Sequence, residues 1–188
     1  MSYTHAEIYR EKPEIFIAPM NIDSFPDFNV TAHRETFRIT FGTDITDEFL
    51  ENELARTRTN SSGDENSVVG AFSGNEIAGH AVLEIRGDIE DHQFGWIHFY
   101  YVAPQFRRQG IGLRLVSYSS EYFKALGLKE FCLRTGENNK AAQAFYLSAG
   151  FSYAPEGNRI GFNGVNELMM RLRINSIIDS SDERYPHG

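Results

Sequence analysis

The 188-residue sequence has only one cysteine and lacks a long apolar run. Its one cysteine, Cys132, cannot form the disulfide framework of a secreted scaffold. No apolar run approaches the roughly 20 residues that a membrane-spanning helix requires. Residues 1–13 are too polar and acidic for a signal sequence. We therefore expect a cytoplasmic protein that needs neither a disulfide nor a membrane.

Basic residues are also scarce. Lysine and arginine total 18, against 26 aspartate and glutamate residues, and the formal net charge at pH 7 is -8. Nonspecific nucleic-acid binding depends on many basic side chains that neutralise phosphates, so we expect no nucleic-acid partner. Five of the six histidines lack the spacing of metal ligands, and the sequence has no second cysteine. We therefore expect no metal site.

The hydrophobic pattern that is present predicts one α/β domain. Composition divides the chain into a patternless extension at 1–13, a domain at 14–174 and a polar tail at 175–188. Apolar residues recur at helical spacing in four segments, 30–41, 49–54, 110–126 and 139–149. Alternating or short apolar runs predict seven strands, at 14–18, 67–72, 76–86, 95–103, 129–135, 151–154 and 166–174. This order predicts a sheet of mixed direction covered by helices.

Two polar regions interrupt this pattern. The segment 59–66 predicts a break after the second helix. Either Asp44 or Thr46 can cap the N-terminus of that helix. An acidic loop at 87–92 precedes the strand at 95–103.

Charge is distributed unevenly along the chain. The stretch 44–53 has five acids and no base, and 84–91 has four acids against one arginine. In contrast, Arg107, Arg108 and Arg114 form a basic island that no acid interrupts. The acidic stretches favour a cationic partner, whereas the basic island favours an anion.

The basic island contains a glycine turn between a strand and a helix. Gly110 and Gly112 follow the strand that stops before Pro104 and stand where the helix begins. Backbone N–H groups and the positive dipole end of a helix favour an anion, and glycine permits its close approach. A Walker loop is excluded because the turn has no Gly-Lys-Ser or Gly-Lys-Thr ending. A dinucleotide-binding turn has a candidate acid in Glu130 but lacks its third glycine.

Two motifs at a matching separation resemble one family. The pattern R-x-x-G-x-G at 107–112, preceded by YVAP at 101–104, resembles the acetyl-CoA signature of the GNAT superfamily of N-acetyltransferases. The segment 138–151 (NNKAAQAFYLSAGF) resembles that family's later motif, an asparagine followed by a helix that bears Phe-Tyr. The resemblance covers roughly 14–174. It implies a GNAT fold, which is a central mixed, mostly antiparallel sheet flanked by helices, with a splay between strands 4 and 5.

The resemblance implies that acetyl-CoA is the co-substrate. Backbone amides from Arg108 to Leu113 would bind the CoA pyrophosphate. Backbone groups of Val102 and Ala103, together with the side chain of Asn138, would bind the pantetheine arm. The full set of implied binding residues is Val102, Ala103, Arg107, Arg108, Gln109, Gly110, Ile111, Gly112, Leu113 and Asn138.

The resemblance also implies that Tyr146 is the general acid. A phenol has a reference pKa of about 10, so it stays protonated and can donate to a departing thiolate, whose reference pKa is about 8.5. A tyrosine on a helix more often packs than catalyses. The motif is what favours catalysis at this position.

The general base is open between His98 and Glu84. Many relatives have a glutamate at the position of Trp96, so that assignment cannot be transferred to this chain. His98 matches a position at which the arylalkylamine acetyltransferases have a catalytic histidine, and imidazole titrates near neutral pH. Strand alternation predicts that Trp96, His98 and Tyr100 share one face. Glu84 lies on the neighbouring strand and is the alternative base.

The resemblance implies an N-acetyltransferase that moves the acetyl group of acetyl-CoA to a primary amine by direct attack in a ternary complex. The acceptor is a small cationic molecule or a protein amine, and the acidic stretches do not separate the two. The alternative is an acyl-CoA-binding sensor or interaction protein with degenerate catalysis. The missing strand glutamate favours that alternative, and Tyr146 opposes it. A homodimer is expected from the family alone.

Overall fold

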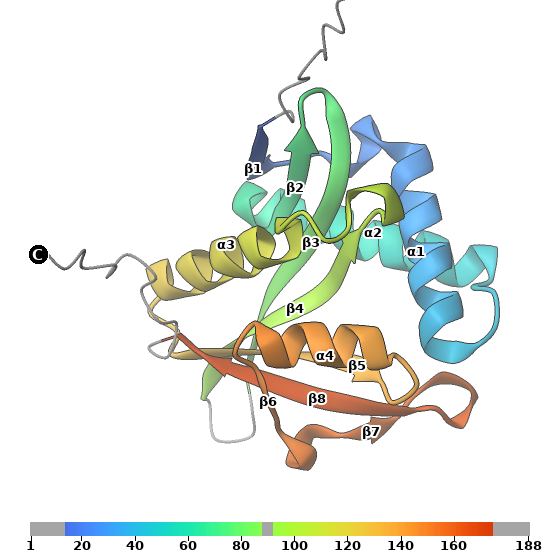
Figure 1. Cartoon of the computed structure of the whole chain (residues 1–188), viewed down its shortest axis with the longest axis vertical. Coiled ribbons are helices and arrows are strands. Elements are labelled where there is room, and N and C mark those ends of the chain that lie inside the picture. The colour runs from blue at the N-terminus through green and yellow to red at the C-terminus, as the bar shows by residue number, and fades with distance from the viewer. Residues whose placement is uncertain (1–13, 88–91, 175–188) are drawn as a thin grey trace, which may run out of the picture.

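A computed structural model of the chain describes residues 14–87 and 92–174 (Figure 1). The predicted extension at 1–13 and the predicted tail at 175–188 lie outside these residues. Residues 88–91, the centre of the predicted acidic loop, lie outside them as well. The proposed domain boundaries therefore stay predictions.

The described residues form four α-helices and eight strands. The helices are α1 (Pro26–Phe41), α2 (Asp47–Gly63), α3 (Ile111–Ala125) and α4 (Lys140–Ser148). The strands are β1 (Ile15–Pro19), β2 (Val68–Ser73), β3 (Glu76–Gly87), β4 (Gln93–Val102), β5 (Glu130–Gly136), β6 (Ser152–Tyr153), β7 (Arg159–Ile160) and β8 (Asn166–Arg173). A short 3-10 turn, η1 (Ile22–Ser24), connects β1 to α1.

The eight described strands form one sheet with helices on both faces. The strand order is β1-β2-β3-β4-β5-β8-β6, β7 also pairs with β8, and β4 and β5 are the one parallel pair among these strands. Figure 1 shows α3 and α4 in front of the sheet and α2 behind it. One core cluster contains Leu115, Phe123 and Phe131, and a second contains Leu50 and Leu54 of α2. The predicted fold class is confirmed.

The parallel ladder between β4 and β5 is short. It joins Gly95 to Phe131 and Trp96 to Cys132 and then ends. The rest of β4 has β3 as its strand partner, and in Figure 1 the ribbons of β4 and β5 run apart beyond this point. This is the predicted splay between strands 4 and 5. It leaves the polar backbone groups on one edge of β4 without a neighbouring strand.

A β-bulge interrupts the regular pairing of β4 with β3. Val82 pairs with Phe99, and the next residue of β3, Leu83, pairs with Ile97. His98 is therefore the extra residue of the bulge. Such an insertion shifts the alternation of side chains along the strand by one position and re-aims the residues around it.

This bulge makes one prediction wrong. Trp96, His98 and Tyr100 were expected to share a face, but His98 contacts Glu53 of α2 while the Tyr100 hydroxyl donates to the Gly112 carbonyl of α3. These two helices cover opposite faces of the sheet. The strand sequence has no glycine or proline at the bulge, so a pattern of alternating residues gives no sign of it.

The predicted break at 59–66 is wrong for residues 59–63, because α2 continues to Gly63. The hydroxyl groups of Thr59 and Ser62 donate to backbone carbonyl groups one turn earlier, at 3.1 and 2.9 Å. Bonds of this kind satisfy a polar side chain within a helix. A polar composition therefore does not stop the helix here.

Candidate active site

The glycine turn places backbone N–H groups at the N-terminus of α3. Gly110 is the N-cap residue with a φ of +79°, a left-handed conformation that favours glycine, and no side chain caps the helix. Arg114 donates its N–H to the Gly110 carbonyl at 3.1 Å, which is the first bond inside the helix. The N–H groups from Ile111 to Leu113 therefore have no acceptor within it. Together with the helix dipole they favour an anion at this point.

The three arginines of the basic island have different surroundings. Arg107 donates from Nε to the Val102 carbonyl at 2.9 Å and from Nη2 to Glu35 of α1 at 2.7 Å. Arg114 donates to a carbonyl group of β1 at 2.7 Å. Arg108 is exposed and adopts a left-handed backbone conformation with a φ of +63°. Arg108 therefore presents its charge to solvent beside the turn.

The end of β4 has one edge on β3 and one edge toward the splay. Ala103 donates its N–H to the Ala78 carbonyl of β3 at 2.9 Å. Hydrogen bonding alternates along an antiparallel strand, so the backbone groups of Val102 point away from β3. Val102 and Ala103, both predicted to bind the pantetheine arm, thus present their N–H groups to opposite edges.

Gly112 allows α3 to approach α4 and β4 closely. A Cβ atom at this position would lie 2.8 Å from the ring of Phe145 and 3.3 Å from the hydroxyl oxygen of Tyr100. The Gly112 carbonyl also accepts the hydrogen bond from Tyr100. The two glycines of the motif therefore differ, since Gly110 provides the turn conformation and Gly112 provides the packing space.

Tyr146 projects from α4 into an aromatic cluster. Its ring centroid lies 6.0 Å from that of Tyr100, 5.2 Å from Phe145 and 5.4 Å from Phe151. Burial raises the pKa of Tyr146, so the phenol stays protonated at neutral pH. Within the described part of the chain, its hydroxyl group has no hydrogen-bond partner. The described fold therefore does not use the proton of that hydroxyl.

Asn138 is exposed in the turn that follows β5. Buried Gln143 of α4 fixes this turn by donating to two of its backbone carbonyl groups, at 3.0 and 2.9 Å. Asn139 caps α4 by accepting from the N–H of Ala142 at 3.1 Å. The side chain of Asn139 is thus used by the fold, whereas that of Asn138 faces solvent.

His98 lies on the other face of the sheet, between two carboxylates. Its Nε2 atom is 2.8 Å from Oε2 of Glu53 on α2, and its Nδ1 atom is 3.7 Å from Oε1 of Glu84 on β3. The first distance is a hydrogen bond and the second is too long for one. The structure therefore brings the two predicted base candidates together and adds Glu53, which the motifs did not indicate.

A signal for Glu53 is present in the sequence. Glu53 lies three residues after Leu50 and next to Leu54, and both leucines are buried. These positions share one face of α2. An acid on the inward face of an amphipathic helix is rare unless it has a partner. The position of Glu53 therefore indicates that its carboxylate pairs with another side chain.

Glu84 is held by a set of donors. Arg56 donates to both carboxylate oxygens at 2.8 Å, Asn60 donates at 3.0 Å and Arg86 at 3.0 Å. Burial alone would raise the pKa of Glu84, but these hydrogen bonds and the nearby His98 lower it to about 2. A carboxylate with this pKa stays ionised at neutral pH and accepts a proton poorly.

Two further histidines lie beneath α1. His33 stacks on Phe99 with ring centroids 4.0 Å apart, and its Nδ1 atom is 2.9 Å from the Asn29 carbonyl. His80 is fully buried, and its ring nitrogens have no hydrogen-bond partner among the described residues. Burial lowers the pKa of both histidines, to about 3 for His80. Both rings are therefore neutral at neutral pH and belong to the core.

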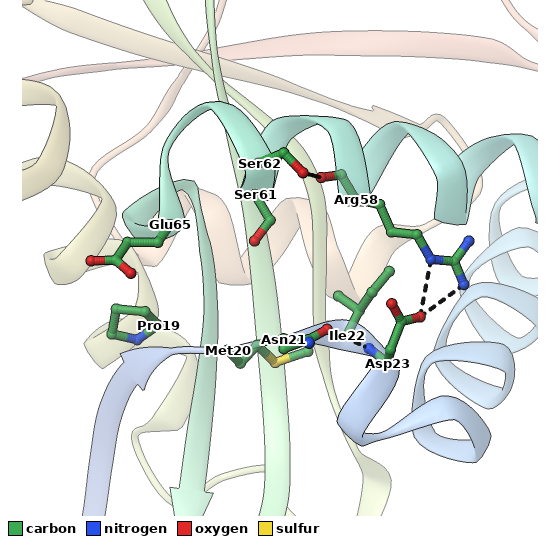
Figure 2. Close-up of a pocket in the computed structure, with 9 residues that line it drawn as sticks. All are labelled: Pro19, Met20, Asn21, Ile22, Asp23, Arg58, Ser61, Ser62 and Glu65. Carbon is green, nitrogen blue, oxygen red and sulfur yellow. Dashed lines mark hydrogen bonds and ion pairs between the residues drawn. The ribbon is translucent and has the colours of Figure 1, made fainter.

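The hollow drawn in Figure 2 lies away from these residues. It has a volume of about 510 Å³ and lies between η1 and the last turns of α2, where Arg58 and Asp23 form an ion pair at 2.9 Å. Its described lining is Pro19, Met20, Asn21, Ile22, Asp23, Arg58, Ser61, Ser62 and Glu65. This lining shares no residue with the predicted site.

Membrane spans, metal ligands and exposed thiols are absent from the described part of the chain. Within residues 14–87 and 92–174, no helix is long and apolar enough to cross a membrane. Those residues also include no group of three or more histidine, cysteine, aspartate or glutamate side chains that could hold a metal ion. Cys132 is buried, and burial raises the pKa of its thiol to about 11.

A sequence profile matches most of the chain. The profile is that of the acetyltransferase (GNAT) family, and it matches residues 29–151. This stretch contains the glycine turn and the aromatic cluster of Tyr146. It also contains His98 with both of its carboxylate neighbours.

Individual relatives agree with this match. Aminoglycoside N(6')-acetyltransferase type 1 from Klebsiella aerogenes is 32% identical over 108 residues, which are 56% of this chain and 66%, just under two thirds, of that relative. Among solved structures, ribosomal-protein-alanine N-acetyltransferase from Brucella melitensis superposes with a TM-score of 0.65 at 20% identity, over 84% of this chain and 99% of that one. PaiA N-acetyltransferase from Thermoplasma acidophilum, in complex with coenzyme A, gives a TM-score of 0.63 at 18% identity, over 85% and 98%. Both of these solved structures have the same fold as this chain.

Proposed function

The chain belongs to the acetyltransferase (GNAT) family, and on that premise we propose that it transfers the acetyl group of acetyl-CoA to a primary amine by direct attack in a ternary complex. The observation that carries the proposal is the junction between the glycine turn and the open edge of β4. An anion site and strand groups without a strand partner adjoin there. Acetyl-CoA has a pyrophosphate and an amide-containing arm that match these two features.

The residues at this junction fit acetyl-CoA. The N–H groups from Arg108 to Leu113 would bind the pyrophosphate, and the exposed Arg108 side chain adds positive charge. The N–H of Val102 would bind the pantetheine arm, because its carbonyl already accepts from Arg107. The exposed Asn138 amide would bind the same arm from the β5 side.

We assign the proton transfers to Tyr146 and His98. When bound, acetyl-CoA supplies a thioester whose acetyl carbon accepts the amine nitrogen. His98 takes one proton from that nitrogen as the C–N bond forms. Tyr146 donates one proton to the sulfur as the C–S bond breaks, and solvent restores both residues. The low pKa of Glu84 supports His98 over Glu84 as the base.

The acceptor that we favour is a small cationic amine. A relative with 32% identity is an aminoglycoside N(6')-acetyltransferase by name. The exposed acids in the first turn of α2, Asp47 and Glu48, would attract a polycation. A protein amine is the second acceptor class. An acid cluster attracts either class. Acetylation of small amines and of a peptide amine, measured side by side, therefore decides between them.

The proposal is tested by calorimetry and mass spectrometry on the full chain. Acetyl-CoA is expected to bind, and one amine among kanamycin, spermidine and a peptide with a free N-terminus is expected to gain one acetyl group. Arg108→Ala should weaken acetyl-CoA binding, with Lys124→Ala, an exposed cation in the last turn of α3, as the control. Absence of acetyl-CoA binding would contradict the proposal.

The same experiment separates an enzyme from a sensor. Binding of acetyl-CoA without acetylation of any amine in the panel would favour an acyl-CoA sensor. The protonated hydroxyl of Tyr146, which has no described partner, supports the enzyme instead. A sensor has no need of an acid at that position.

A further inference from the structure

His98, the extra residue of the β4 bulge, forms a hydrogen bond with Glu53 of α2. The bulge aims the imidazole at α2, where Glu53 reaches it from the inward face of the helix at 2.8 Å. The imidazole is 11% exposed and the Glu53 side chain is 23% exposed. This contact joins residues that lie 45 positions apart in the chain.

The charge of Glu53 determines which nitrogen of His98 has the proton. Burial alone would raise the pKa of Glu53, but the hydrogen bond and charge of His98, with smaller effects of His33 and Arg56, lower it. Glu53 is therefore ionised at neutral pH, and an ionised carboxylate accepts hydrogen bonds but cannot donate one. Nε2 must be the donor in the contact with Glu53. A neutral His98 then has its lone pair on Nδ1.

Charged side chains lie around the Nδ1 atom of His98. Glu84 on β3 is ionised, and its Oε1 atom lies 3.7 Å from Nδ1. An imidazolium formed by protonation of Nδ1 is attracted to both carboxylates. Arg56 and Arg86 offset part of this attraction because they pair with Glu84. His33, beneath α1, is neutral and adds no opposing charge.

We propose that Glu53 is a positioning residue of the reaction. It holds His98 with Nε2 protonated, so that Nδ1 takes the proton of the acceptor nitrogen directly or through one water molecule. The proposal rests on the proposed function for the role of His98 as base. Its statement about the protonated nitrogen stands without that function, and the two can therefore be tested separately.

A structural role for the same contact makes different predictions. A tie that serves only to hold α2 on β4 would affect the free energy of unfolding and nothing else. A positioning role also fixes the tautomer of His98 and the turnover number for the amine. It leaves the Michaelis constant for acetyl-CoA unchanged, because the anion site lies at the turn before α3.

Two substitutions of Glu53 separate charge from hydrogen bonding. Glu53→Gln keeps an oxygen that can accept from Nε2 but loses the charge. Glu53→Met has a similar length and loses both. Glu51→Met changes an exposed acid on the same helix and is the matched control. The midpoint of thermal unfolding of each variant reports folding independently.

The first measurement is the tautomer of His98 by long-range ¹H–¹⁵N spectroscopy of the labelled full chain, with His98→Gln used to assign the signal. We expect the Nε2-protonated form in the wild type, in Glu51→Met and in Glu53→Gln, and its loss in Glu53→Met. An Nδ1-protonated form in the wild type, or an unchanged spectrum in Glu53→Met, would overturn the proposal. If Glu53→Met does not fold, the wild type alone still decides the tautomer.

The second measurement is the turnover number with whichever amine of the panel the wild type acetylates fastest. We expect a fall of about 10- to 100-fold in Glu53→Met and a smaller fall in Glu53→Gln. The Michaelis constant for acetyl-CoA should stay within about twofold. Equal turnover in wild type and Glu53→Met overturns the positioning role. Absence of turnover in the wild type overturns the proposed function, and the tautomer then decides the proposal about Glu53.

Discussion

The glycine turn and the His98 cluster are built in opposite ways. The turn is one continuous segment, 107–113, and it presents backbone N–H groups that have no acceptor within the helix they begin. The cluster takes Glu53, Glu84 and His98 from a helix and two strands, and its side chains are largely buried. A backbone site can be recognised from residue spacing, whereas a side-chain cluster depends on contacts between distant segments. The first was predictable in detail and the second only in part.

The largest expected effect comes from Tyr146→Phe, which tests whether the α4 face and the His98 face act in one reaction. Loss of the hydroxyl removes the proton donor and keeps the packing against Tyr100, Phe145 and Phe151. We expect the turnover number to fall by about 100-fold or more. Steady-state release of CoA, measured with the best amine, checks this.

The control for that variant is Tyr118→Phe, which removes the hydroxyl of a half-buried tyrosine of α3 that donates to the Asn66 carbonyl. It should keep the turnover of the wild type. Calorimetry should give the same affinity for acetyl-CoA in both variants, because neither hydroxyl belongs to the glycine turn. Unchanged turnover in Tyr146→Phe would remove the acid from the proposal.

The next effect is structural and concerns the turn. Gly112→Ala places a methyl group 2.8 Å from the ring of Phe145, so α3 or α4 must move. Overpacking of this kind costs about 1–3 kcal/mol of unfolding free energy. Denaturant unfolding would measure it. A change within the experimental error would show that α3 and α4 yield more easily than the contact implies.

A smaller effect, confined to acid pH, tests how much the ion pairs of Glu84 in the His98 cluster contribute to stability. The pKa of Glu84 is lowered from 4.5 to about 2, so its ion pairs stabilise the folded state fully above pH 4.5. That contribution is lost as the pH falls toward 2. Between pH 5 and pH 3, we expect the midpoint of thermal unfolding to fall less in Glu84→Gln than in the wild type. Parallel curves for the two proteins would contradict this account, and Glu51→Gln is the control.

The smallest expected effect concerns the N-cap of α2, which belongs to neither the glycine turn nor the His98 cluster. Thr46, not Asp44, caps α2, because its Oγ1 atom accepts from the N–H of Phe49 at 3.2 Å. Thr46→Ala should cost about 1 kcal/mol of unfolding free energy. Turnover should not change, since α2 stays docked through Leu50 and Leu54. A large loss of turnover would show that the start of α2 has a role beyond its cap.

Much of the fold could be predicted because local patterns encode it. The order of strands and helices from 14 to 174 follows from periodicity, apart from the two-residue strand β7, which is too short to have a period. The turn at Gly110 follows from the left-handed conformation that glycine permits. The splay between β4 and β5 came from the family resemblance, not from the residues themselves.

The remainder depends on interactions that one strand or helix does not contain. The bulge at His98 is fixed by pairing with β3, so alternation along β4 placed Tyr100 on the wrong face. Arg107 stays a predicted acetyl-CoA-binding residue, and the motif gave no sign that its guanidinium also contacts Glu35 of α1, 72 positions away. The helical spacing places Glu53 on the inward face of α2, but nothing in the sequence indicates its partner. Its contact with His98 becomes apparent once α2 is packed on the sheet.

The central claim is that the turn binds acetyl-CoA while Tyr146 and His98 transfer protons. The most direct measurement is the rate of CoA release from acetyl-CoA with kanamycin, spermidine or a peptide amine, in the wild type and in His98→Ala. We predict amine-dependent release in the wild type and a large loss in the variant. Release that requires no amine, or equal rates in the two proteins, would contradict it.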